Sequence, residues 1–160
     1  MARLTGVFVD TSVLLGGTID VGPSCKPAQA VLDAVAARRL RARTAWHCCL
    51  EYYAVATRLP EELRLAPADA LRLLEEEVLG RLQVVDLPAD RRLAFLRSVA
   101  DQGVVGGRLY DAHIAEIARR CGAQTIVTDN PRHFRSLALD GTRVLTSAEL
   151  ANELTRSLSR

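Results

Sequence analysis

The sequence contains no hydrophobic run that approaches the length of a membrane-spanning helix. Such a helix needs about 20 consecutive, mainly apolar residues. The first residues also lack the charged segment followed by an apolar one that marks a secretory signal. These two absences predict a protein without a membrane segment that works in the cytoplasm.

The cysteines lack the paired C-x-x-C spacing of a zinc site. There are four, Cys25, Cys48, Cys49 and Cys121, and we expect them to be reduced and partly buried. The adjacent pair Cys48 and Cys49 has two interpretations, a redox-active pair or two small apolar residues inside a helix. We favour the second, because free cysteine commonly behaves as a small buried apolar residue.

Lysine is nearly absent from the chain. Lys26 is the only lysine among 21 basic residues, so arginine carries almost all of the positive charge. The arginine guanidinium binds phosphate through a planar fork of donors, which points to nucleic acid as a partner. However, the formal net charge is only +2 at pH 7, and a high arginine content also follows from the base composition of a genome. Composition alone does not decide between these two origins.

The chain is long enough for one substantial core, with 160 residues of which 49% are hydrophobic, and we predict a single domain over residues 1–160. Short β-branched runs alternate with helical patterns. We expect an α/β fold, a three-layer α/β/α sandwich with a mainly parallel central sheet. The predicted strands cover residues 6–9, 40–43, 82–85, 125–128 and 143–145. The predicted helices cover residues 28–39, 46–58 and 67–79 and begin near residues 88, 109 and 146, and a glycine-rich loop covers residues 16–27.

Four acidic residues lie in four separate parts of this pattern. Asp10 and Asp129 each follow a predicted buried strand. Asp111 lies in the first turn of a predicted helix, beside an apolar stripe that includes Tyr110. Glu51 lies in another predicted helix, among apolar neighbours that we expect to bury it. Parallel strands end at one edge of the sheet, where α/β proteins bind their ligands. The sequence therefore predicts that Asp10 and Asp129 converge and that the four acids form a divalent-metal site.

Each acid also has a simpler structural interpretation. Asp10 is suited to cap a helix, Asp111 to interact with a helix dipole, and Asp129 to form a turn before Asn130. The three histidines, His47, His113 and His133, lie in different elements without ligand spacing. We expect the histidines to have surface or packing roles.

The four acidic segments together resemble the PIN-domain nucleases, and they are most similar to the VapC-type toxin ribonucleases of type II toxin-antitoxin systems. The resemblance spans nearly the whole chain and rests on these motifs: F-V-D-T-S at residues 8–12, Glu51, L-Y-D-A-H-I-A at residues 109–115, and I-V-T-D-N-P-R-H-F at residues 126–134. It implies a Mg²⁺- or Mn²⁺-dependent endoribonuclease that hydrolyses RNA phosphodiester bonds. It also implies a small antitoxin partner and often a homodimer.

The resemblance assigns roles to individual residues. Asp10 and Asp111 would contact the metal directly, and Glu51 and Asp129 would complete the acidic pocket or bind through water. The side chains expected to hold these acids in place are those of Thr11, Ser12 and Thr128. Apart from the resemblance, Arg108, Arg132 and Arg135 flank two of the motifs, and they either contact RNA phosphates or are ordinary solvated side chains. In many relatives the fourth acid stands at the position of Asn130, so either Asp129 or Asn130 fills that place, and a one-metal site is an alternative.

The chemistry of hard cations agrees with these roles. Mg²⁺ and Mn²⁺ prefer oxygen ligands, and crowded carboxylates repel one another unless a cation lies between them. A bound cation lowers the pKa of its water and offsets charge on a phosphodiester during in-line attack. Two alternative functions would use different chemistry. A catalytically weakened PIN fold would bind RNA or protein, and a phosphoaspartyl hydrolase would use Asp10 as its nucleophile but would want an aspartate where Ser12 stands.

Overall fold

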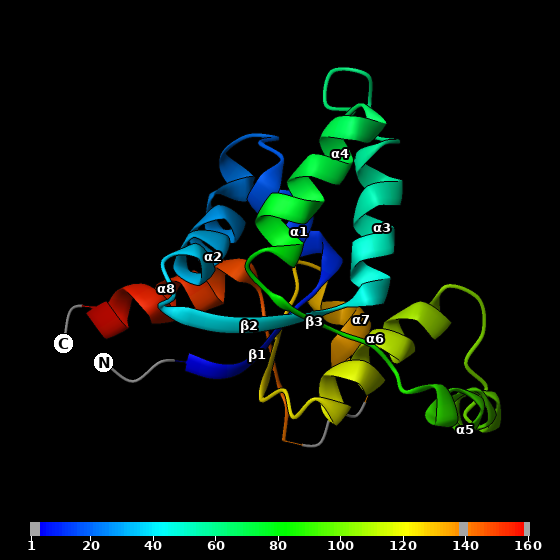
Figure 1. Ribbon diagram of the computed structural model, residues 1–160. Coiled ribbons are helices and arrows are strands. Elements are labelled where there is room, and N and C mark those ends of the chain that lie inside the picture. Colours follow the sequence, from blue (N-terminus) through cyan, green and yellow to red (C-terminus); the bar gives the residue numbers. More distant parts are fainter. Residues whose placement is uncertain (1–3, 138–140, 159–160) are drawn as a thin grey trace.

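A five-stranded, fully parallel sheet forms the centre of the molecule (Figure 1). The computed structural model describes residues 4–137 and 141–158. The strand order is β3-β2-β1-β4-β5. The strands are β1 (Leu4–Val9), β2 (Leu40–Ala45), β3 (Gln83–Val85), β4 (Thr125–Val127) and β5 (Arg143–Leu145). All five predicted strands are present, and the predicted α/β class is confirmed.

The direction in which the chain adds strands reverses at β1. The chain adds β2 and β3 on one side of β1 and then β4 and β5 on the other. The register pairs Val9 with Val127, and the Asp10 amide donates to the Val127 carbonyl at 3.0 Å. The residues that follow β1 and β4 therefore lie side by side at the switch point, where open α/β sheets form their binding crevice.

Helices cover both faces of the sheet (Figure 1). One group packs through the pairs α1 with α2, α2 with α8, and α3 with α4, and the other through α6 with α7. The helices are α1 (Thr11–Thr18), α2 (Lys26–Ala36), α3 (Trp46–Ala56), α4 (Pro67–Leu73), α5 (Ala89–Asp101), α6 (Arg108–Arg120), α7 (Pro131–Arg135) and α8 (Ser147–Leu158), with a 3₁₀ turn at Pro23–Cys25 and a π-helical segment at Leu74–Leu79 that continues α4. Within the described part of the chain, none of these helices is both long and apolar enough to cross a membrane.

The loop predicted for residues 16–27 is wrong in its first part, because α1 continues to Thr18. A Cβ at Gly17 would lie 2.4 Å from Leu32 Cδ1, and one at Gly16 would lie 3.2 Å from Ala28 Cβ. The two glycines therefore allow α1 and α2 to pack closely. This contact outweighs the low helix propensity of glycine.

The buried side chains come from the inner faces of these layers. Phe8 and Val9 of β1 are fully buried, as are Ile126 and Val127 of β4. Tyr52 of α3 is also fully buried, and its hydroxyl forms a hydrogen bond of 2.8 Å with that of Thr18. The core thus fixes α1 and α3 against the central strands, just beside the switch point.

Candidate active site

Asp10 is a buried acid at the end of β1, with only 6% of its surface exposed. It stands at the N-cap position of α1, but its side chain makes no capping hydrogen bond. Burial raises the pKa of the Asp10 carboxyl and the negative charge of Glu51 raises it further, while hydrogen bonds from Thr128, Ser12 and the Thr11 backbone lower it. The charge that acts on Asp10 is therefore another negative one, which is the setting in which a cation stabilises the ionised form.

Two hydroxyl groups hold the Asp10 carboxylate across the switch point. Thr128 Oγ1 donates to Asp10 Oδ2 at 2.7 Å, and Ser12 Oγ donates to the same oxygen at 3.0 Å. The backbone amides of Asp129 and Asn130 in turn donate to Ser12 Oγ and Thr128 Oγ1, at 3.0 and 3.1 Å. The expected hydrogen bonds from Ser12 and Thr128 are therefore present, and they fix the orientation of Asp10.

Glu51 reaches the same place from α3. Its Oε2 accepts a hydrogen bond of 2.5 Å from Thr11 Oγ1, so the expected contact between Thr11 and a site acid is also present. The expected burial of Glu51 is wrong, because the residue is exposed. The apolar neighbours Cys48, Cys49 and Tyr52 point into the core, and Glu51 lies on the side of α3 that faces the cleft.

Asp111 approaches from the first turn of α6, where it is partly buried. Its Oδ2 lies 3.3 Å from Nδ1 of His133, which is on α7. Sequence reasoning missed His133, because it found no ligand spacing among the histidines. The short helix α7 places His133 one turn after Asn130, and this proximity to the fourth motif was the available signal.

Asp129 has a different environment from the one predicted for a metal ligand. Its Oδ1 accepts hydrogen bonds from the backbone amide of Ser147 at 3.0 Å and from Ser147 Oγ at 2.7 Å. Ser147 begins α8, so Asp129 satisfies a free amide at the start of that helix. Asn130 lines the cleft and Asp129 does not. The turn after β4 therefore directs the two neighbouring side chains to different partners.

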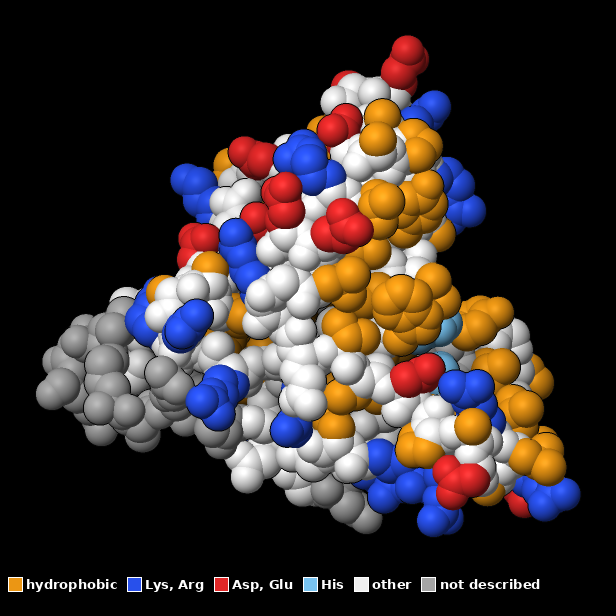
Figure 2. All heavy atoms as spheres, viewed as in Figure 1, with side chains coloured by type: hydrophobic (Ala, Val, Ile, Leu, Met, Phe, Trp, Pro, Cys, Tyr) orange, Lys and Arg blue, Asp and Glu red, His pale blue; other side chains and the backbone are white. Residues whose placement is uncertain are grey.

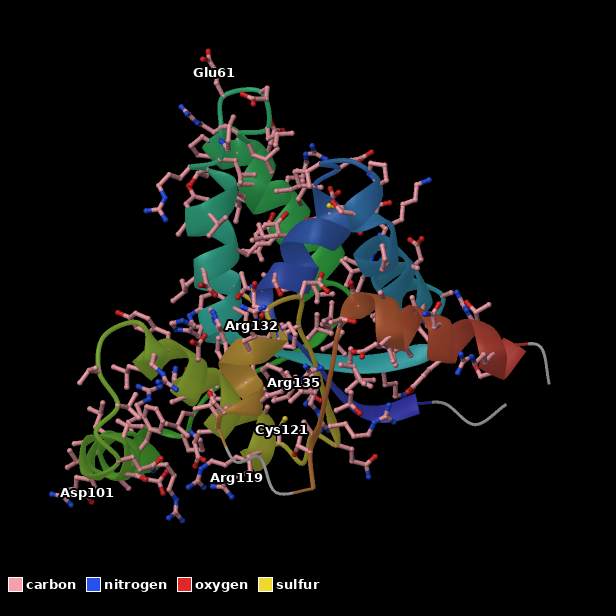
Figure 3. The ribbon with its side chains drawn as sticks, turned by 180° about the vertical axis from the view of Figure 1, so that it is seen from behind. Glu61, Asp101, Arg119, Cys121, Arg132 and Arg135 are labelled. Atoms are coloured by element: carbon pink, nitrogen blue, oxygen red, sulfur yellow. The ribbon has the colours of Figure 1, made fainter. Side chains whose placement is uncertain are left out.

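These residues surround one cleft of about 770 Å³. Its acidic wall is formed by Asp10, Glu51 and Asp111, and its other polar side chains include Asn130, Arg108, Arg132 and His133. Figure 3 shows Arg132 on α7, on the side of the molecule that holds the cleft, whereas Arg119 and Cys121 lie at the far end of α6.

Tyr110 also lines the cleft and is 56% exposed, so its predicted place on the buried stripe of α6 is wrong. The stripe begins one turn later.

The donor set of the cleft suits a hard divalent cation, because carboxylate and amide oxygens are the ligands that such ions prefer. Within residues 4–137 and 141–158, no three His, Cys, Asp or Glu side chains are grouped closely enough to hold a metal ion together. Mg²⁺ commonly keeps several waters and uses only one or two protein carboxylates. Asp10 and Asp111 both line the cleft, so they are the candidates for this smaller number of carboxylate ligands.

A comparison with known families identifies the fold. The sequence model of the PIN domain matches residues 6–132, which include most of β1, all of α3 and α6, and the turn after β4. The chain belongs to the PIN-domain family. This confirms the family that the motifs indicated, and the four acidic segments of the PIN domain are the ones that meet around the cleft or beside it.

Individual relatives of this PIN domain are known in sequence and structure. Ribonuclease VapC27 of Mycobacterium tuberculosis is 40% identical over 84 residues, which cover 52% of this chain and 58% of that protein. The match therefore spans little more than half of the relative's length. The crystal structure of Mycobacterium tuberculosis VapC20, described as a Sarcin-Ricin loop cleaving toxin, has a TM-score of 0.62 at 17% identity and covers 86% of this chain and 98% of that one. VapBC2 of Rickettsia felis, bound to a DNA fragment from its promoter, has a TM-score of 0.60 at 15% identity and covers 88% and 97%. At these identities the structural likeness concerns the fold.

Proposed function

We propose that this PIN domain is a Mg²⁺- or Mn²⁺-dependent endoribonuclease that hydrolyses RNA phosphodiester bonds, and that it is the toxin of a toxin-antitoxin pair that acts in the cytoplasm. The observation that carries the proposal is the buried Asp10 carboxylate, held by two hydroxyl groups beside the acids Glu51 and Asp111. A surface that bound RNA without cleaving it would gain nothing from three acids where phosphate must approach. The similarity to Ribonuclease VapC27 supports RNA as the substrate.

Asp10 and Asp111 would hold the cation, with Glu51 and the Asn130 oxygen as additional or water-mediated ligands. Asp129, which binds Ser147, would act by positioning α8 and the turn after β4. A bound divalent cation lowers the pKa of a coordinated water and offsets the negative charge that builds on the phosphate oxygens. The protein itself supplies the oriented carboxylates and the shape of the cleft.

The remaining residues of the cleft would bind and place the RNA strand. Arg108 and Arg132 would contact the phosphates on either side of the scissile bond, since their guanidinium groups carry positive charge at the edge of an acidic site. His133 would hold Asp111 in one orientation through its Nδ1 contact. During hydrolysis a water oxygen forms a new bond to phosphorus, and the bond from phosphorus to the leaving ribose oxygen breaks. The attacking water loses one proton and the leaving oxygen gains one, so the protons balance.

Two partners follow from the same proposal. A small antitoxin protein would cover the cleft and keep the nuclease inactive, and a second copy of the chain would form a homodimer. The VapBC2 assembly of Rickettsia felis, which has a similar fold in its toxin part, supports an antitoxin of the VapB kind.

The test is cleavage of end-labelled structured RNA and of matched single-stranded DNA by the purified protein. We expect RNA to be cut in Mg²⁺ or Mn²⁺ and not in EDTA, and the Asp10→Asn and Asp111→Asn variants to lose at least about 100-fold in rate, because each removes one charged group that acts in the transition state. Intact RNA with all metals, from a protein shown to be folded and free of antitoxin, would favour the alternative in which a weakened PIN fold binds RNA or protein. Equal cutting of DNA would contradict the substrate.

A further inference from the structure

A second hollow lies next to the acidic cleft and shares one side chain with it. This groove, of about 560 Å³, is formed between α3, α5 and α6. Tyr110 lines both the cleft and the groove. Figure 2 shows histidine side chains between the hydrophobic groups that cover α3 and α5 on this face of the molecule. A chain that left the cleft past Tyr110 would enter the groove.

Aromatic and imidazole rings form much of the wall of the groove, together with leucine side chains. His47 stacks on Tyr110, with ring centroids 5.2 Å apart and an interplanar angle of 23°. His113 meets His47 edge to face at 5.6 Å, and Phe95 packs on His113 at 5.3 Å. These contacts fix Tyr110 by one face and leave 56% of the residue exposed. Trp46 also lines the groove and is 45% exposed, so two large ring surfaces are accessible.

Polar groups lie beside the rings. Asp86 and Arg92 line the groove as an exposed pair with 3.4 Å between Oδ2 and Nη2. The imidazole nitrogens of His47 and His113 can also form hydrogen bonds, so the groove combines flat apolar walls with groups that can form hydrogen bonds to the edge of a flat ligand.

We propose that this groove is a nucleobase-binding subsite, which takes an unpaired base of the RNA strand whose backbone lies in the acidic cleft. Proteins that recognise single-stranded RNA place unstacked bases on aromatic side chains and read their edges by hydrogen bonds. Tyr110 connects the groove with the cleft, because it is next to Asp111 in the chain and lines both hollows. The inference rests on the proposed nuclease function and adds to it a requirement for an unpaired base beside the scissile bond.

Exposed leucines in the groove and at its edge suggest a different occupant, a second copy of the chain. Leu93 and Leu96 on α5 are 58% and 49% exposed, and Leu50 on α3 is 55% exposed. The base is favoured because Tyr110 continues the groove into the acidic cleft, and because rings and a charged pair lie beside the leucines that line the groove. The experiment distinguishes the two.

Trp46 makes the experiment direct, because it is the only tryptophan of the chain and it lines the groove. Its fluorescence is measured during titration with short single-stranded 2′-O-methyl oligonucleotides whose linkages are uncharged methylphosphonates. These probes are not hydrolysed and are not repelled by the acidic cleft, so the result is independent of whether the protein cuts RNA. The control probe has the same backbone without bases. We expect the base-bearing probe to quench Trp46 and the abasic probe to have no effect.

Tyr110→Leu should weaken the binding of the base-bearing probe by about tenfold or more, the scale of one base–aromatic stack. The matched control is Tyr53→Leu, a tyrosine on α3 that is 38% exposed and does not line the groove, and this variant should bind as the wild type does. No quenching, or equal quenching by the abasic probe, would overturn the proposal. Emission that changes with protein concentration and not with the probe would overturn it in favour of a second copy, and RNA cleavage would remain to be judged by its own assay.

Discussion

The hydroxyl of Thr128 donates a hydrogen bond of 2.7 Å to the carboxylate of Asp10, although 118 residues separate the two in the chain. The bond joins the ends of β1 and β4 at the switch point of the sheet. It also fixes one oxygen of a buried acid whose pKa is raised by burial. The proposed metal site therefore depends on a contact between two strand ends that are distant in the sequence.

Replacement of Thr128 by valine keeps the shape of the side chain and removes its hydroxyl. We expect the affinity for Mn²⁺ to fall by about tenfold or more, since loss of a group that orients a metal ligand commonly has this effect. The measurement is calorimetric titration with Mn²⁺. Thr142→Val is the control, because the Thr142 hydroxyl donates to the Ala123 carbonyl, before β4 begins. Equal affinity of the wild type and Thr128→Val would show that the hydroxyl does not orient Asp10 for the metal.

Asp10 should make the metal-free protein less stable as the pH rises. The unfolded chain releases the Asp10 proton near the ordinary pKa of 3.8, and the folded protein releases it at a higher pH. Between these two values the folded state binds more protons, so the contribution of Asp10 to the free energy of unfolding is most favourable below the unfolded pKa and decreases as the pH rises through the folded pKa. Above the folded pKa the loss is complete.

The Asp10→Asn variant lacks the ionisable carboxyl, so its free energy of unfolding lacks the pH-dependent contribution of Asp10. In EDTA at neutral pH we expect the variant to be more stable than the wild type by about 1–3 kcal/mol, the typical cost of a buried polar group that is not fully compensated. The difference should shrink in acid and in saturating Mn²⁺. Urea unfolding in EDTA at several pH values gives the measurement. A variant that is less stable at every pH would show that the charge of Asp10 does not destabilise the metal-free fold.

Asp129→Asn tests whether Asp129 positions α8 or binds metal. The asparagine keeps an oxygen that can accept from Ser147, so we expect near-normal stability and cleavage within a few-fold of the wild type. Asp129→Ala loses both hydrogen bonds to Ser147 and should lower the free energy of unfolding by about 1–3 kcal/mol. If Asp129→Asn is folded but as inactive as Asp111→Asn, then Asp129 acts as a ligand.

Gly17→Ala should destabilise the fold by about 1–3 kcal/mol, the usual cost of overpacking a core. The added Cβ would lie 2.4 Å from Cδ1 and 2.7 Å from Cγ of Leu32, and Leu32 is itself buried at 2% exposure. Gly107→Ala is the control, because its φ is −61° and nothing lies within 4 Å of its Cβ position. Thermal unfolding of both variants in EDTA gives the comparison. Similar melting temperatures would show that α1 and α2 adjust without cost.

The parts of the fold that were predicted correctly depend on local patterns. The run Val7–Phe8–Val9 is apolar up to the acid that follows it, and a short apolar run rich in β-branched residues is typical of a buried parallel strand. The start of α8 is also a local pattern, because a threonine at 146 followed by a glutamate at 149 has the spacing of a capping box. The structure shows both hydrogen bonds of that box, from the Thr146 amide to Glu149 at 2.7 Å and from the Glu149 amide to Thr146 at 3.2 Å.

The parts that were missed depend on how elements pack. The two glycines of α1 favour a loop by their low helix propensity, and the close packing of α2 against them explains why they lie in a helix. The choice between Asp129 and Asn130 depends on the turn after β4, in which Asn130 has a φ of −116° and a ψ of 59°, and no periodic pattern predicts such a turn. Tyr110 fits the helical stripe of α6, but the core does not extend to the first turn of that helix.

The central claim is that Asp10 and Asp111 together hold a hard divalent cation in the cleft. The most direct measurement is electron paramagnetic resonance of Mn²⁺ bound by the wild type, Asp10→Asn, Asp111→Asn and Asp129→Asn, with the folded state of each checked by circular dichroism. We predict saturable binding by the wild type and by Asp129→Asn, and affinity at least about tenfold weaker in the other two variants. Binding that is absent in the wild type, or unchanged in Asp10→Asn and Asp111→Asn, would contradict this claim.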